Sequence, residues 1–395
     1  MPDQPQNQPN DRPSKPVPLL DINRGNEAYL PEILRKVEQI CRSGHFIGGP
    51  HCQELEQTVA AICNTGFAVG CASGSDALLL ALMAIDLQPG DEVIVPSFTF
   101  FASVSAITRL GARPVFVDID PLTYNMNPRL LNGLVTRKTR AIMPVHLFGQ
   151  CCDMDAIRMV ALEHDLHVIE DAAQAIGAGF KGEPACSMGS IGCISFYPTK
   201  NIGGFGDAGV VTCNNPQLAD RLRLLANHGM RPRYYHDLVG VNSRLDAIQA
   251  AVLCSKLPGL EMCAVARTRN ADLYRRLFTA AGLADVIALP ESDSRCNHIW
   301  NQFTIRIPGG QRDHVRSQLT ERGIGTEIYY PVPMHQQQCF RHIEYQPGSL
   351  GETEKAASEV LSLPIFPELT REEIESVVDK LASVLATESP LRRAA

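Results

Sequence analysis

The run DEVIVP at residues 91–96 decides the fold class of this chain, because five later runs repeat its character. These are RPVFVDID (113–120), RAIMPV (140–145), HVIEDA (167–172), CISFYP (193–198) and AGVVTC (208–213). Short runs in which successive residues are apolar, without polar alternation, and which are rich in β-branched residues are typical of strands buried on both faces. Helical stretches such as DALLLALMAIDL (76–87) lie between several of them. We therefore predict an α/β fold with a mostly parallel sheet covered by helices on both faces.

The character of the sequence changes past residue 257. NQFTIRI (301–307) and TEIYYPVP (326–333) look like strands, and the stretch at 312–325 between them looks like a helix that ends in glycine. Near the end of the chain, apolar residues repeat at helical spacing after a capping box formed by Thr370 and Glu373.

Three parts of the chain follow from these patterns. The first 18 residues are rich in Pro, Gln, Asn and Asp, which predicts a flexible tail. Residues 19–257 should form a large α/β domain and residues 258–395 a smaller C-terminal α+β domain. Ligands bind at the carboxyl ends of the strands in such a sheet, so the chemistry should lie there.

Composition excludes several functional classes. The 395 residues carry a formal net charge of -7, with 45% hydrophobic and 20% charged residues, which argues against a general nucleic-acid binder. Thirteen cysteines show no paired metal-ligand spacing, so we expect free thiols and no metal site. The N-terminus has no apolar core of a secretory signal, and no stretch reaches the roughly 18 apolar residues of a membrane span. We predict a cytoplasmic protein that binds neither membrane nor nucleic acid.

Lys200 is the first candidate for chemistry. It lies in SFYPTKNIGGFGDAGVVT (195–212), straight after a predicted strand and before a glycine-rich turn. A partly desolvated lysine has a lowered pKa and can form a Schiff base with a carbonyl compound such as pyridoxal 5'-phosphate (PLP). A solvated surface lysine is the alternative for Lys200 taken alone, and three other elements favour the cofactor.

Asp171, in VIEDAAQAIGA (168–178), is the first of these elements. It ends a predicted strand, where its carboxylate could pair with the pyridine nitrogen and keep the ring protonated as an electron sink. Glu170 competes for this role, although strand alternation sends it to the opposite face. Gln174 follows within reach of the phenolic oxygen of the ring. Taken alone, Asp171 is as well explained as a helix cap.

Two further elements lie upstream. Gly74 and Ser75 begin an apolar helix in CASGSDALLLAL (71–82), and the free N–H groups of a helix N-terminus bind phosphate. Phe100, in VPSFTFFAS (95–103), could stack on the pyridine ring. A plain helix cap and a core phenylalanine remain the respective alternatives.

The ordered set of motifs resembles the DegT/DnrJ/EryC1/StrS family of PLP-dependent sugar aminotransferases, which have the type I aspartate-aminotransferase fold. The resemblance runs from about residue 19 to the last helix. Its marks are FIGGP (46–50), SGSDAL (73–78), PSFTFFAS (96–103), PVHLFGQ (144–150), EDAAQAIGA (170–178), SFYPTKNIGGFGDAG (195–209), VGVNSRLDAIQAA (239–251) and YYPVPMH (329–335).

The resemblance implies roles for five further residues. Ser195 would bind the cofactor phosphate together with Gly74 and Ser75, and Asn242 would reach the phosphate site of a neighbouring subunit in a homodimer with shared active sites. Substrate contacts are implied for Arg244, Tyr330 and His335. Two structural alternatives remain open: Asn242 could cap the helix that begins near Asp246, and Arg244 could be an interface ion-pair partner.

The implied reaction moves an amino group from L-glutamate through PLP on Lys200 to a nucleotide-linked keto-sugar, for amino-sugar or surface polysaccharide biosynthesis. Two alternatives are a PLP-binding regulator or sensor without turnover and a related sugar dehydratase, although the dehydratases carry histidine in place of the lysine. Many relatives have His-Tyr where this chain has Tyr329-Tyr330, and Tyr or Trp where it has Phe100. These departures leave the identity of the sugar open.

Overall fold

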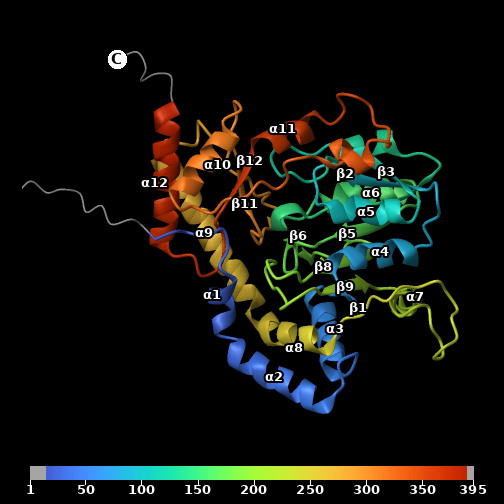
Figure 1. The fold of residues 1–395 in the computed structure, drawn as a ribbon. Helices are drawn as coiled ribbons and strands as arrows, with labels where there is room; N and C mark the ends of the chain where they lie inside the picture. Colours follow the sequence, from blue (N-terminus) through green and yellow to red (C-terminus); the bar gives the residue numbers. More distant parts are fainter. Residues whose placement is uncertain (1–14, 389–395) are drawn as a thin grey trace, which may run out of the picture.

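A computed structural model describes residues 15–388 of the chain (Figure 1). Residues 1–14, most of the predicted tail, lie outside this range, as do residues 389–395. The end of that predicted tail is packed against the protein: Val17 is buried, its N–H donates to the Gly323 carbonyl at 2.8 Å, and its own carbonyl accepts from Gly325. The packed chain therefore begins before residue 19.

Seven strands form the central sheet, in the order β1-β9-β8-β5-β4-β2-β3. Their bounds are β1 Phe67–Cys71, β2 Glu92–Pro96, β3 Arg113–Val117, β4 Thr139–Ile142, β5 His167–Asp171, β8 Ile191–Ser195 and β9 Gly209–Cys213. Pairing is parallel from β3 to β8, and β9 alone runs against its neighbours. All six predicted runs are strands of this sheet, whereas β1 was not predicted.

Helices cover both faces of the sheet. Successive residues of a strand point to opposite faces, so neighbouring strand residues pack against different helices. Ile94 and Ile194 pack with α3 (Pro50–Ile62), α6 (Met154–Glu163) and α8 (Ala247–Lys256). Val95 and Cys193 pack with α4 (Gly74–Ala84), α5 (Phe101–Arg109) and α7 (Pro216–Ala226). The predicted fold, a mostly parallel sheet with helices on both faces, is confirmed.

The remaining elements lie before and after this layered core in sequence, except β6 (Gly179–Phe180) and β7 (Glu183–Pro184), which lie between β5 and β8. The chain begins with α1 (Ile22–Glu27) and α2 (Leu30–Ser43) and ends with α9 (Leu260–Ala280), β11 (Phe303–Arg306), α10 (Arg312–Glu321), α11 (Gly351–Glu359), β12 (Val360–Leu363) and α12 (Arg371–Glu388). A small sheet joins β6, β7 and β10 (Cys296–Asn297).

Predictions for the C-terminal part were confirmed except for one strand. The strand near residue 303, the helices α10 and α12, and the capping box are present: Thr370 and Glu373 exchange backbone-to-side-chain hydrogen bonds at 2.9 and 3.2 Å. The predicted strand at 326–333 is wrong. Glu327 alone pairs with the free edge of β12, as an isolated bridge to Ser362. Beyond it Pro331 and Pro333 have no N–H to donate to a ladder, and the segment turns toward the central sheet, where the Met334 N–H donates to the Ser97 carbonyl at 2.9 Å.

Residue 257 lies in a short 3-10 turn, Leu257–Gly259, between α8 and α9. Before this turn, α8 packs against the N-terminal helices α2 and α3, whereas after it α9 packs against the C-terminal helix α12. We retain residue 257 as the proposed domain boundary for this reason.

The continuous helical stretch 247–280 contains a window long and apolar enough to cross a membrane. This window passes by mean hydropathy only: polar residues such as Gln249, Lys256 and Glu261 interrupt it, so it is not a continuous apolar run of the kind that the sequence was predicted to lack. More than half of this window (56%) is buried inside the protein, and α9 also buries the polar side chains of Arg267 and Asn270. The helical stretch 247–280 is therefore explained as a helix of the protein core.

Candidate active site

A cavity of about 450 Å³ opens at the carboxyl ends of β2, β5 and β8. This is the edge of the sheet where ligands bind in folds of this type. Seven predicted site residues line it: Gly74, Ser75, Phe100, Asp171, Gln174, Ser195 and Lys200, with Tyr330 from the C-terminal part as an eighth. Residues separated by more than 250 positions in the chain therefore share one cavity.

Lys200 lies five residues beyond the end of β8, in a turn closed by a hydrogen bond of 2.8 Å from its own N–H to the Tyr197 carbonyl. Burial lowers the pKa of its amine from 10.5 to about 8, and the negative charge of Asp171 opposes this shift. A lysine with a pKa near 8 is neutral in a substantial fraction of molecules around physiological pH. It can therefore act as a nucleophile and exchange protons.

The glycine-rich turn after Lys200 is held by side chains from α8. Lys256 donates its Nζ to the Gly203 carbonyl at 2.5 Å, and the Gln249 side-chain carbonyl accepts from the Phe205 N–H at 2.8 Å. A Cβ atom at Gly203 would lie 2.3 Å from the Pro198 carbonyl oxygen, so only glycine allows the turn to fold back this closely. The turn that follows Lys200 is thus built into the core.

Asp171 ends β5 and is 4% exposed. Its Oδ2 accepts from the Ser103 hydroxyl at 2.7 Å, and its Oδ1 accepts from the Ala173 N–H at 3.2 Å. Burial raises the pKa of this carboxyl group, while the two hydrogen bonds and the charge of Lys200 oppose the rise. The bond to Ala173 closes a short local turn, and the next α-helix along the chain, α7, begins only at Pro216, so Asp171 is no helix cap.

Glu170 faces the other side of the sheet, as strand alternation predicted. Its carboxylate is completely buried and accepts from the N–H groups of Cys186, Met188 and Gly189 at 2.8, 2.8 and 2.5 Å. The His146 ring lies 2.9 Å away and donates to it from Nε2, because its Nδ1 accepts from a backbone N–H. Glu170 does not line the cavity, and its hydrogen-bonding capacity is used within the protein.

The N-terminus of α4 points into the cavity. Ser73 caps this helix by accepting from the Asp76 N–H at 3.1 Å, which leaves the N–H groups of Gly74 and Ser75 without partners inside the helix. A Cβ at Gly74 would lie 2.5 Å from the Cβ of Ser195, so glycine lets the helix start approach the end of β8. Backbone donors and the Ser195 hydroxyl together form a cradle suited to a phosphate group.

Gln174 has a defined orientation. Its side-chain carbonyl accepts from the Phe148 N–H at 2.7 Å, so its amide nitrogen points to the Tyr330 hydroxyl at 3.3 Å. The ring of Phe100 lies 6.1 Å from that of Tyr330 and is 57% exposed, which rules out the alternative of a core phenylalanine. Gln174 therefore presents donors, and Phe100 an aromatic face, at the cavity.

Three predicted site residues do not reach this cavity. His335 was expected in the substrate cleft, but its ring is buried between Ser97 (Nδ1 to Oγ, 2.7 Å) and Glu354 (Nε2 to Oε1, 3.1 Å), where it links the two parts of the chain. Asn242 and Arg244 are exposed. Asn242 forms an isolated bridge with Asn227, and Arg244 donates to the Asn227 side chain at 3.2 Å. The cap of α8 is Asp246, so the alternative that Asn242 caps this helix is wrong.

Sequence reasoning missed other residues of the cavity. Its lining also includes Ser73, Leu78, Thr99, Ala102, Val145, Leu147, Ala173, Tyr197, Thr199, Asp207, Gln302 and Tyr329, and Ser103 lies behind Asp171. Several of them belong to the motifs at 96–103 and 195–209. Their position within or beside these motifs was the one sequence signal that could have identified them. No spacing rule tells which hydroxyl groups point toward the cavity.

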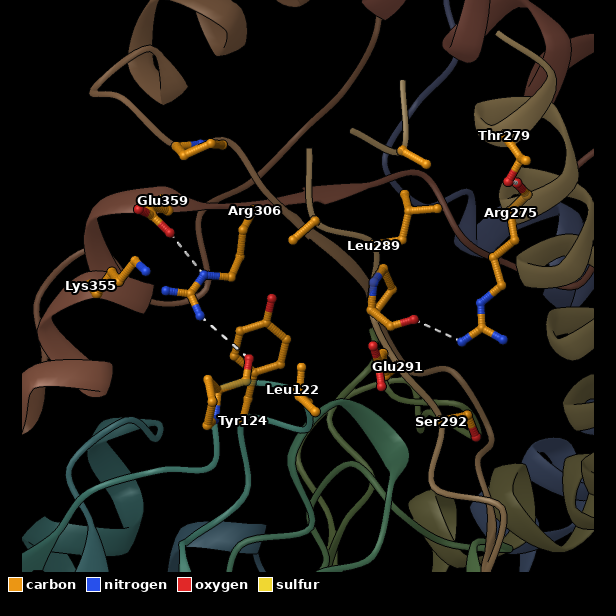
Figure 2. A pocket seen from close by; sticks show the side chains of 15 residues that line it. Leu122, Tyr124, Arg275, Thr279, Leu289, Glu291, Ser292, Arg306, Lys355 and Glu359 are labelled. Carbon is orange, nitrogen blue, oxygen red and sulfur yellow. Dashed lines mark hydrogen bonds and ion pairs between the residues drawn. The ribbon is translucent and has the colours of Figure 1, made fainter. Parts of the chain in front are cut away.

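A larger crevice of about 800 Å³ lies between the segment at Pro121–Tyr124, α9 and β11 (Figure 2). None of the predicted site residues lines it. Its two arginines already have partners within the protein: Arg306 donates to Glu359 at 2.9 Å, and Arg275 donates to the Pro290 carbonyl at 2.8 Å (Figure 2). One buried nitrogen of Arg306, Nη2, has no hydrogen-bond partner within the described part of the chain.

Metal and disulfide chemistry find no support in the part of the chain that the structure describes. All thirteen cysteines are free thiols, and most are buried. Across residues 15–388, no group of three or more His, Cys, Asp or Glu side chains could hold a metal ion.

Comparison with known proteins places this geometry in context. The sequence profile of the DegT/DnrJ/EryC1/StrS aminotransferase family matches residues 29–382. A pleiotropic regulatory protein of Geobacillus stearothermophilus is 46% identical over 366 residues, which cover 93% of this chain and 98% of the relative. The UDP-N-acetyl-3-dehydro-alpha-D-glucosamine 3-aminotransferase of Acidithiobacillus ferrooxidans is 42% identical over 369 residues, with coverages of 93% and 98%. The crystal structure of S. venezuelae DesV in complex with a ketimine intermediate superposes with a TM-score of 0.90 at 41% identity, covering 94% of this chain and 98% of that one.

Proposed function

Because this chain belongs to the DegT/DnrJ/EryC1/StrS family of PLP-dependent aminotransferases, we propose that it transfers the amino group of L-glutamate to a nucleotide-linked keto-sugar. The observation that carries the proposal is the meeting of Lys200, Asp171 and the N-terminus of α4 in one cavity. An amine, a buried carboxylate and a phosphate cradle are the three groups that PLP chemistry needs from a protein.

The cavity residues fit PLP on two independent observations. A buried carboxylate without a full set of donors, Asp171, lines the cavity and would pair with the pyridine nitrogen. The close approach of Gly74 to Ser195 forms the cradle that would hold the phosphate. Gln174 would donate to the phenolic oxygen, and Phe100 would cover the ring. When bound, PLP supplies the electron sink that stabilises a carbanion next to the transferred nitrogen.

The protein's own residues carry the proton chemistry. Lys200 attaches the cofactor in the resting protein and, once displaced, moves a proton between the α-carbon of the amino donor and the acceptor carbon. Its lowered pKa makes both the neutral and the protonated amine accessible near neutral pH. Asp171 holds the proton on the ring nitrogen through its negative charge. The two half-reactions would run in turn, with the keto acid from the donor leaving before the sugar binds, which gives ping-pong kinetics.

The remainder of the cavity supports a sugar as the acceptor. The residues that line it include Tyr197, Thr199 and Tyr330, which carry hydroxyl groups, and Gln174 and Gln302, which carry side-chain amides, together with aromatic rings. Such a lining offers hydrogen bonds to a polyhydroxylated ring. The relative from A. ferrooxidans is named for amination at carbon 3 of a UDP-linked sugar, so a UDP-linked 3-keto-sugar is the first acceptor to test. We assign the reaction to the cytoplasm and to amino-sugar synthesis for surface polysaccharides.

A homodimer with shared sites is part of the proposal. The segment that carries Asn242 lies next to exposed apolar side chains: Tyr234 and Tyr235 are 73% and 69% exposed, and Ile47, which bridges to Asp246, is 58% exposed. Exposed apolar side chains near one segment are typical of a protein interface. We assign this face to a second copy of the chain and Asn242 to the phosphate site of that copy.

Mixing two inactive variants tests the shared site. Lys200→Ala and a variant at Asn242 are purified, combined, left to exchange subunits and assayed. One of the two sites in each hybrid dimer then has both wild-type contributions, so activity should rise above that of either parent. If exchange is verified, the Asn242 variant is folded and inactive, and activity stays at parental level, Asn242 acts within its own subunit.

A regulator that binds PLP without turnover is the second candidate, because one relative is named a pleiotropic regulatory protein. A sugar dehydratase is disfavoured because Lys200 stands where those enzymes carry histidine. The absorbance spectrum separates the candidates. A band of lysine-bound PLP that bleaches on addition of L-glutamate indicates a working half-reaction, and transfer to UDP- and dTDP-linked keto-sugars then identifies the acceptor. A stable band that glutamate leaves unchanged would contradict the aminotransferase proposal and favour the regulator.

A further inference from the structure

A chain of buried hydroxyl groups leads from the cavity to the back of Asp171. Thr99 lines the cavity, and its Oγ1 lies 2.9 Å from the Oγ of Ser103. Ser103 in turn lies 2.7 Å from Oδ2 of Asp171. All three side chains are buried, at 1%, 0% and 4% exposure respectively. Water therefore cannot replace any of these hydrogen bonds at little cost.

The direction of the hydrogen bonds follows from counting protons. An ionised carboxylate only accepts, so the Ser103 hydroxyl must use its single proton on Asp171. Ser103 can then interact with Thr99 only as an acceptor, which makes the Thr99 hydroxyl the donor. The order is Thr99 to Ser103 to Asp171, and each hydroxyl group strengthens the next bond by polarising it.

We propose that Ser103 is a positioning residue that orients the Asp171 carboxylate and keeps it ionised for the cofactor, with Thr99 as its support. This inference rests on the proposed PLP function. Ser103 does not line the cavity and acts through Asp171 alone. The Ala173 N–H occupies the other carboxylate oxygen, so the two donors together define the plane of the group.

The electrostatics agree with this role. Burial raises the pKa of Asp171, and the Ser103 hydrogen bond opposes that rise more than the Ala173 N–H or the charge of Lys200 does. Without the hydroxyl, the buried carboxyl group would take up a proton more readily. A neutral Asp171 would no longer hold a proton on the ring nitrogen.

Three single variants test the proposal in the PLP-bound protein. Ser103→Ala should lower kcat about 10-fold, the size expected for one hydrogen bond to a charged group. Thr99→Val should lower it by less. Ser105→Ala is the matched control, since Ser105 lies two residues further along α5 and its hydroxyl donates to the Ala102 carbonyl at 3.3 Å, away from Asp171. The control should keep wild-type kcat.

The pH titration of the bound cofactor's absorbance band provides a readout that general damage would not move. Loss of the ring's positive charge lets the neighbouring imine nitrogen keep its proton to higher pH. The midpoint should therefore rise in Ser103→Ala, rise less in Thr99→Val, rise most in Asp171→Asn and stay unchanged in Ser105→Ala. An unchanged midpoint in Ser103→Ala overturns the proposal. If that variant does not fold, an unchanged midpoint in Thr99→Val overturns it equally.

A double-mutant comparison isolates the route through Asp171. Ser103→Ala made in the Asp171→Asn background should change kcat by less than about twofold, because the carboxylate it serves is already gone. An equal loss in both backgrounds would show that Ser103 acts through packing. Failure of the PLP function itself looks different, since the wild-type protein would then show no lysine-bound absorbance band at all.

Discussion

Asp171 and Glu170 are neighbours in sequence, and both carboxylates are buried, yet the two faces of β5 give them opposite surroundings. Glu170 accepts from three backbone N–H groups and from His146, all within the protein. Asp171 accepts from Ser103 and Ala173 and otherwise faces a cavity that also contains Lys200. Burial alone therefore does not mark a functional carboxylate. The difference lies in whether the protein completes its hydrogen bonds or leaves capacity for a ligand.

The largest expected effect lies on the cavity side. Lys200→Ala should abolish transamination while leaving the thermal midpoint nearly unchanged, because the side chain projects into a cavity and contributes little to packing. The variant should keep some PLP through the phosphate cradle but lack the absorbance band of the lysine-bound form. Activity assays, spectra and melting curves check this. Wild-type turnover in the variant would falsify the assignment of Lys200.

Asp171→Asn should have the second largest effect. Without the negative charge the ring nitrogen loses its proton, the electron sink weakens, and kcat should fall by roughly 100-fold or more. Cofactor retention, measured by dialysis, should fall only modestly because the phosphate contacts remain. Near-normal turnover with bound cofactor would mean that another group pairs with the ring.

Glu170→Gln should lower the stability of the protein and leave turnover nearly intact, the opposite of the effect expected at Asp171. The replacement places an amide next to several N–H donors and removes a buried, hydrogen-bonded charge, so we expect a loss of about 2–4 kcal/mol in the free energy of unfolding. Turnover per folded molecule should stay within a few-fold of wild type. Chemical denaturation and active-site titration measure the two quantities. A large loss of kcat without loss of stability would erase the distinction between the two faces.

The smallest expected effect is a shift in a pH profile. In the cofactor-free protein, covalent recapture of PLP should speed up as pH rises through about 8, because burial lowers the pKa of Lys200 and only the neutral amine attacks. The charge of Asp171 raises this pKa, so Asp171→Asn should move the midpoint below 8. Glu170→Gln serves as the matched control and should leave the midpoint in place. A midpoint near 10 in the wild-type protein would show that Lys200 is solvated.

Sequence patterns predicted much of the fold because its strands are short, apolar and buried on both faces. They failed at residues 326–333, where β-branched and aromatic residues suggest a strand but only Glu327 pairs with the free edge of β12, and the chain then turns toward Ser97 of the central sheet. They also missed β1, whose sequence FAVGC has a single β-branched residue and includes alanine and glycine, so it carries a weak strand signal. Pairing depends on the path that the chain takes past a free edge, and that is a property of the assembled fold.

Within the candidate site, local sequence motifs identified Lys200, Asp171, Gln174, Ser195, Gly74, Ser75 and Phe100, all of which line one cavity. Each of these residues follows a strand end or begins a helix, so the topology of a parallel sheet alone brings them to one edge. His335 was assigned to the substrate cleft and instead bonds to Ser97 and Glu354. A histidine in a loop carries no periodicity, so its sequence does not reveal which way the ring turns.

The sequence by itself determined the α/β class, the edge of the sheet that carries the cavity and the order of the groups around it, because these depend on apolar periodicity and chain topology. Only the tertiary structure decided that Ser103 and Thr99 support Asp171, that Lys256 and Gln249 hold the turn after Lys200, and that His335 joins two parts of the chain. These are hydrogen bonds between side chains and groups whose approach depends on packing of separate elements. No local pattern encodes such distances.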